Sequence, residues 1–202
     1  MPVTAERLQL LIEAVDRDVI MVNPCHGVKL KKRYDERDTR DKWSFLTWAE
    51  QCAIAACQAI PYEDRLMITI AAGTGMRQGE MRHLEMRHVA IDGPDPYLDI
   101  RVAGRDRRDP TKRLPTKSGK PREVPLLLGV RDAVREWLQI RPLYAPHNPD
   151  DLVFPTRTGG LRQSGKFFGR SNTLRGYYAA AGVKLRPYLH HHALRHTFAT
   201  NL

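Results

Sequence analysis

Three short segments of this 202-residue chain gather the side-chain types that phosphate chemistry uses. The first, residues 74–80, reads T-G-M-R-Q-G-E and places Arg77 at the expected start of a helix. A guanidinium carries a fork of N–H donors that matches phosphate oxygens, and helix N-termini favour anions. Glu80 follows one turn later and can orient this arginine, although an ordinary exposed ion pair has the same spacing.

The second segment, residues 116–122, reads T-K-S-G-K-P-R and predicts a hairpin tip rich in cations. A lysine at such a turn can contact a DNA backbone, or can protonate a leaving oxygen if its pKa is lowered. The residue pattern alone does not choose among Lys112, Lys117 and Lys120. A solvated basic loop has the same composition.

The third segment, residues 190–200, reads H-H-H-A-L-R-H-T-F-A-T. His192 and Arg195 share one helical face, and His192 and His196 have the i, i+4 spacing of metal ligands. Residues 152–202 contain no Asp, Glu or Cys that would complete a zinc site, so we expect no metal. His190 and His191 read as a structural or tag-like histidine run.

The charge of the chain is concentrated in two blocks. The formal net charge is +10, with nine basic and two acidic residues in 101–122 and eight basic and no acidic residues in 152–202. The remainder is net acidic. This distribution predicts a polyanion-binding face, with nucleic acid favoured over an anionic membrane surface. The cations expected to contact DNA are Arg105, Arg107, Arg108, Lys112, Arg113, Lys120, Arg122, Arg162 and Lys166.

Length and composition indicate a globular protein of one domain, or one domain plus a fragment of another. Apolar residues make up 42% of the chain, and no apolar run approaches the ~20 residues of a membrane helix. The N-terminus has no secretory signal pattern. The three cysteines, Cys25, Cys52 and Cys57, form no C-x-x-C pair, which suits a reducing compartment.

The elements that must position the three segments follow from hydrophobic periodicity and breaker residues. Residues 29–42 are almost entirely charged and predict a solvated linker. Thr47 and Glu50 fit a capping box at the start of a helix. Helices are predicted over about 4–19, 47–60, 62–72, 78–87, 130–138, 167–182 and from 191 onward, and strands over about 98–102 and 124–126. The pattern predicts a mainly helical α+β domain with a small antiparallel sheet.

Taken together and in this order, three motifs resemble the tyrosine recombinases, the phage-integrase family. They are T-G-M-R-Q-G-E-M-R-H-L at 74–84, T-K-S-G-K-P-R-E-V-P-L at 116–126 and H-A-L-R-H-T-F-A-T at 192–200. The F-L-T segment at 45–47 and the N-P-C segment at 23–25 are also typical of that family. The resemblance implies the catalytic-domain fold of the family over 43–202, a linker over 34–42, and the last helix of a core-binding domain in 1–33.

The resemblance also implies roles for individual residues in a DNA strand cleavage that needs no metal or other cofactor. Arg77 and Arg195 would clamp the scissile phosphate, because phosphoryl transfer depends on positioning and charge stabilisation. Lys117, the first lysine of the T-K-x-G-K pattern, would protonate the departing 5′ oxygen. His192 would assist proton transfer at the attacking tyrosine, and Glu80 would orient its neighbours.

One part of the family pattern is not found in these 202 residues. The family's nucleophilic tyrosine follows the H-x-x-R motif, whereas all seven tyrosines here precede Arg195. We therefore expect double-stranded DNA binding without cleavage in cis. The family assembles as tetramers on DNA, and a monomer is expected for this chain, in the bacterial or phage-host cytoplasm on nucleoid DNA. The alternatives are a non-catalytic DNA-binding remnant or regulator, and a metal-free RNase that uses His192, Lys117 and Arg195.

Overall fold

The computed structural model describes residues 13–15, 17, 19–20, 44–105, 113–116, 119–169 and 172–200. The chain divides into two compact units, Met1–Arg40 and Asp41–Leu202. In the first unit residues 13–15 are helical, within the helix predicted over 4–19. The rest of that helix and the predicted linker lie outside the described residues. The domain assignment over 1–33 and 34–42 therefore stays a prediction.

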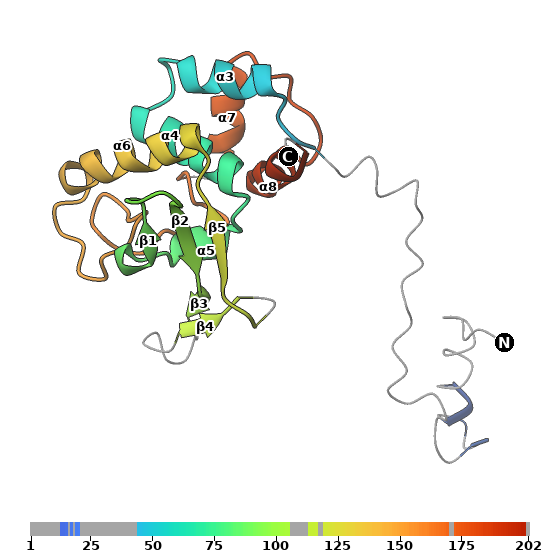
Figure 1. Ribbon diagram of the computed structural model, residues 1–202. Helices are drawn as coiled ribbons and strands as arrows, with labels where there is room; N and C mark the ends of the chain where they lie inside the picture. The colour runs from blue at the N-terminus through green and yellow to red at the C-terminus, as the bar shows by residue number, and fades with distance from the viewer. Residues whose placement is uncertain are drawn as a thin grey trace. The chain divides into compact units, whose positions relative to one another are not determined.

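The second unit is an α+β domain, as the sequence predicted (Figure 1). Helices gather around α4, which packs against α3, α6 and α8, while β1, β2 and β5 lie beside α5 in Figure 1 and β3 and β4 lie farthest from α3. The elements are α3 (Trp48–Ala56), α4 (Tyr62–Thr74), α5 (Gln78–Arg82), the 3₁₀ helix η1 (Met86–His88), β1 (Val89–Ala90), β2 (Tyr97–Ile100), β3 (Val102–Arg105), β4 (Arg113–Pro115), β5 (Arg122–Pro125), α6 (Leu128–Tyr144), α7 (Thr173–Ala180) and α8 (His191–Thr200).

The strands form two small antiparallel sheets. One has the order β1-β2-β5, with Leu98 opposite Val124 and Ile100 opposite Arg122. The other pairs β3 with β4 and contains a bulge between Val102 and Gly104. The strand predicted over 98–102 is therefore two strands, β2 and β3, and β4 was not predicted. Its three residues are exposed, so hydrophobic alternation gave no signal for it.

The core lies between the helices and one face of the sheet. Trp137 of α6 is fully buried, donates its indole N–H to the Val153 carbonyl at 2.7 Å, and stacks on Phe154. Phe154 meets Phe167 edge to face, which extends the cluster toward α8. Burial of such large aromatic side chains contributes roughly 1.5–3 kcal/mol each, so this cluster is a principal source of stability.

Three predicted helices are shorter than the sequence indicated, and the one predicted over 47–60 ends at Ala56. The helix predicted over 78–87 ends at Arg82, because Glu85 forms a β-bridge with Leu152 and the Met86 N–H donates to the Asp151 carbonyl at 3.0 Å. The helix predicted over 167–182 begins only at Thr173. Phe167 and Phe168 are buried in a turn, so their apolar side chains indicated that this segment is buried and did not indicate a helix.

Candidate active site

The turn between α4 and α5 places Arg77 at the N-cap of α5. Gly75 ends α4 in the left-handed region with φ of 58°. A β-carbon at this glycine would lie 2.5 Å from the ring of Phe198, so only glycine fits between α4 and α8 without movement. The left-handed residue redirects the chain and lets α5 begin three residues later.

Glu80 is the buried carboxylate of the site, with 1% of its surface exposed. Arg77 donates to it twice, from the backbone N–H to Oε2 at 2.8 Å and from Nη1 to Oε1 at 3.1 Å. Arg122 donates from Nη1 to Oε1 at 2.9 Å and from Nη2 to Oε2 at 2.7 Å. Burial alone would raise the pKa of Glu80, but the hydrogen bonds from Arg122 and Arg77 outweigh it and lower the pKa. The carboxylate is therefore ionised at neutral pH.

Helix α8 brings the second arginine to the same place. The Nη1 of Arg195 donates to the Gly75 carbonyl at 2.5 Å, across 120 residues of sequence. Burial lowers the pKa of Arg195, and the nearby charges of Arg77 and Arg122 lower it further. The carboxylate of Glu80 acts in the opposite direction. Two guanidinium groups thus bind the carboxylate of Glu80, and the third, that of Arg195, lies near enough to feel their charges. Their uncompensated positive charge makes the cluster suited to an anion such as a phosphodiester.

The first turn of α8 also carries His192, which is exposed. Its backbone N–H donates to Nδ1 of His190 at 3.2 Å, and its ring meets that of His196 edge to face at 4.8 Å. Burial and then the charges of His196, His190, Arg195 and Arg77 lower the pKa of His192. A neutral imidazole beside the two arginines can accept or relay a proton at neutral pH.

Two hollows border this cluster of Arg77, Glu80, Arg122, His192 and Arg195. One, of about 360 Å³, lies between β5 and α8 and is lined by residues that include Arg122, Arg195 and Phe198. The other, of about 370 Å³, is lined by Gln78, Gly165 and residues 190–192.

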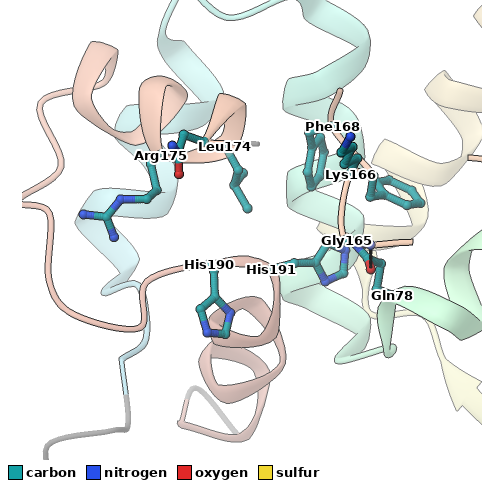
Figure 2. Close-up of a pocket in the computed structure, with 10 residues that line it drawn as sticks. Gln78, Gly165, Lys166, Phe168, Leu174, Arg175, His190 and His191 are labelled. Atoms are coloured by element: carbon teal, nitrogen blue, oxygen red, sulfur yellow. Dashed lines mark hydrogen bonds between the residues drawn. The ribbon is translucent and has the colours of Figure 1, made fainter. Parts of the chain in front are cut away.

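A smaller pocket of about 110 Å³ adjoins the second hollow and shares Gln78, Gly165, His190 and His191 with it (Figure 2). The Gly165 N–H donates to Oε1 of Gln78 at 2.8 Å, which ties the 163–169 loop to α5. His191 packs against the rings of Phe167 and Phe168. Burial lowers its pKa to about 4, so His191 is a neutral packing residue, which agrees with the structural one of the two alternatives that the sequence left open.

Several predicted DNA-contacting cations have partners within the protein. Arg113 pairs with the buried carboxylate of Glu85, which also pairs with Arg87 at 2.8 Å. Arg122 is engaged by Glu80, as described above. Lys120 and Lys166 are exposed. Lys112, Lys117, Arg107 and Arg108 lie outside the described residues, and Arg105 is described only as backbone of β3.

The prediction that Arg162 contacts DNA is wrong. This arginine is 6% exposed and donates to the carbonyls of Phe154 and Phe167 at 3.2 and 2.7 Å. Its remaining nitrogen donates to the Tyr144 hydroxyl at 2.9 Å. All three guanidinium nitrogens are thus used inside the fold, so Arg162 holds the 154–167 segment together.

Sequence reasoning placed Arg77, Glu80, His192 and Arg195 among the functional residues, and the structure brings them together. Nothing in the sequence indicated that Arg122 pairs with Glu80, because the two residues are 42 positions apart and no local pattern links them. Within the part of the chain that the structure describes, no group of three or more His, Cys, Asp or Glu side chains is arranged to hold a metal. None of the helices described is long and apolar enough to span a membrane.

The chain folds as an α+β domain in which Arg77 and Arg122 bind the buried Glu80, and comparison with known proteins gives its family. Residues 48–202 match the model of the phage integrase family. The chain therefore belongs to this family, the tyrosine recombinases.

Among curated relatives, the chain is 30% identical over 197 residues to the tyrosine recombinase XerC of Yersinia pestis, covering 93% of this chain and 54% of that protein. It is 26% identical over 188 residues to XerC of Proteus mirabilis, covering 93% and 53%. The chain thus spans about half the length of the curated relatives it matches.

Solved structures share the fold. The Tn1549 transposon integrase in complex with a circular intermediate DNA gives a TM-score of 0.65 at 22% identity, covering 96% of this chain and 63% of that one. The XerH site-specific recombinase in a post-cleavage complex with its difH substrate gives 0.60 at 22% identity, covering 86% and 46%.

Proposed function

We propose that this chain supplies the phosphate-activating part of a site-specific DNA recombinase acting on double-stranded DNA. The observation that supports this most is that Arg77, bound to the buried Glu80, and Arg195, bound to the Gly75 carbonyl, come to the same turn from segments far apart in sequence. Adjacent like charges are unfavourable until an anion lies between them. The relatives XerH and the Tn1549 integrase were solved with DNA, in keeping with a scissile phosphate as that anion.

In the proposed reaction Arg77 and Arg195 donate to the non-bridging oxygens of the scissile phosphate and stabilise the charge that develops there. A tyrosine hydroxyl oxygen attacks phosphorus, and its proton passes to His192. The bond from phosphorus to the 5′ oxygen breaks as Lys117 donates a proton to that oxygen. Attack by a 5′ hydroxyl on the phosphotyrosine reverses these steps and rejoins the DNA.

The attacking tyrosine is proposed to come from outside these 202 residues. Tyr177 donates to Asp64 at 2.6 Å, and burial together with that carboxylate raises its pKa, which makes it a poor nucleophile. Tyr178 is fully buried. The complete recombinase would act as a tetramer on DNA in the bacterial cytoplasm, and the 202-residue polypeptide would bind DNA as a monomer.

The proposal that this chain binds DNA while the attacking tyrosine comes from elsewhere can be tested directly. The 202-residue polypeptide, incubated with nicked or bridging-phosphorothioate attachment-site DNA, is expected to bind without forming a denaturant-resistant adduct. Electrophoresis after denaturation measures the adduct, and a mobility-shift assay at low salt measures binding. A covalent adduct would contradict the external tyrosine, whereas an absence of any binding at low salt would contradict the DNA-binding proposal itself.

A further inference from the structure

Arg122 occupies a position that its sequence context did not indicate. It lies on β5, an edge strand of the three-stranded sheet, opposite Ile100 of β2. Its side chain is about one-third exposed, yet both terminal nitrogens donate to Glu80. A bidentate pair of this kind fixes both partners in one geometry, which a single contact does not.

The two oxygens of Glu80 are shared equally between two arginines. Oε1 accepts from Nη1 of Arg77 and Nη1 of Arg122, and Oε2 accepts from the Arg77 backbone and Nη2 of Arg122. Because a carboxylate accepts about four hydrogen bonds, this buried group is saturated. Arg77 needs only one side-chain nitrogen for it and has 37% of its side chain exposed.

We propose that Arg122 is a positioning residue that acts through Glu80 on the guanidinium of Arg77. By taking half of the carboxylate's acceptor capacity, Arg122 holds Glu80 in place and leaves the other nitrogens of Arg77 for a phosphate. Without Arg122, Glu80 swings toward Arg77 and competes with the phosphate for the same donors. The proposal rests on the proposed function in one respect, namely that the anion bound by Arg77 is a phosphate.

The test uses nuclear magnetic resonance of the whole 202-residue chain, with labelled Glu80 carboxyl carbon and Arg77 Nε. Arg122→Gln is compared with Arg122→Lys and with the control Arg101→Gln, which removes an exposed arginine paired with Asp99 in the same sheet region. We expect the pKa of Glu80 to rise in Arg122→Gln, to rise less in Arg122→Lys, and to stay unchanged in Arg101→Gln.

The second measurement is the shift of the Arg77 Nε signal on titration with inorganic phosphate. We expect phosphate affinity at Arg77 to fall roughly tenfold in Arg122→Gln and to recover in part in Arg122→Lys. Melting curves of each variant show whether it is folded. If Arg122→Gln does not fold, Arg122→Lys, which retains the positive charge, carries the test.

Two results would overturn the proposal. One is an unchanged Glu80 pKa together with an unchanged Arg77 signal in Arg122→Gln. The other is an equal loss of duplex-DNA affinity in Arg122→Gln and Arg101→Gln with Arg77 unaffected, which would make Arg122 an ordinary backbone contact. If phosphate shifts no Arg77 signal in the unchanged protein, the proposed function fails, while the Glu80 pKa still decides the role of Arg122.

Discussion

At the scale of single residues, Glu80 determines how much positive charge the site presents. It neutralises one of three nearby guanidiniums and is itself almost completely buried. Changing this carboxylate to an amide leaves Arg77 and Arg122 facing each other without a counter-charge. Breaking a buried ion pair from one side is strongly destabilising, because the remaining charge is uncompensated.

We expect Glu80→Gln to lower the free energy of unfolding by about 3 kcal/mol at neutral pH. Because the pKa of Glu80 is lower in the folded protein than its ordinary 4.5, the stabilisation is complete above that pH and is lost as the pH falls through the lowered pKa. Urea denaturation of both proteins at several pH values measures this. A difference between them that stays constant down to about pH 3 would contradict the assignment.

At the scale of elements, close contacts of glycines set how α5 and α8 approach their neighbours. Gly75 lies against Phe198, and a β-carbon on Gly79 would lie 2.5 Å from the carbonyl oxygen of Ala103 in β3. The first contact fixes the distance between the two arginine-bearing segments. The second holds α5 close to the hairpin strand.

Gly75→Ala is therefore expected to destabilise the domain by about 2–3 kcal/mol, from the left-handed backbone and the overlap with Phe198. Gly176→Ala is the matched control, since Gly176 lies in α7 with open space around its α-carbon. The control is expected to be neutral or to stabilise by about 0.5–1 kcal/mol. Thermal melting measures both, and equal effects would contradict the steric account.

Sequence patterns predicted those elements whose signal is local, and missed those that depend on contacts between distant residues. The capping box of Thr47 and Glu50 formed as predicted, because its signal is contained in four adjacent residues. The early end of α5 was missed, because the bridge from Glu85 to Leu152 joins positions 67 residues apart in sequence. The motifs identified Arg77 and Arg195, whereas the two hydrogen bonds from Arg122 to Glu80 are visible only in the folded structure.

At the scale of the whole molecule, the number of basic residues in the two blocks overstates the number of cations that are unpaired on the surface. Several of their cations are neutralised internally, by Glu80, by Glu85 or, for Arg157, by Glu63. Fewer cations are therefore available to an anionic backbone than the nine and eight basic residues of the two blocks suggest. Salt dependence of binding counts the cations that do meet phosphates.

Lys166→Ala and Arg162→Ala separate these two kinds of cation. We expect Lys166→Ala to reduce the slope of log affinity against log salt by about one, with little effect on stability. Arg162→Ala instead leaves two buried carbonyls without donors and lowers the free energy of unfolding by about 3 kcal/mol. Mobility shifts over a salt series and urea denaturation measure the two effects. A reduced slope with unchanged stability in Arg162→Ala would contradict its internal role.

The hydrogen bond from Arg195 to Gly75 has a consequence for protein synthesis. It closes the site across 120 residues, and α8 is the last described helix of the domain to leave the ribosome. A nascent chain contains Glu80 and Arg122 before it contains Arg195, because both residues precede α8 in the sequence. It cannot assemble the two-arginine site until α8 follows. During translation the two arginines thus cannot come together until α8 has been made.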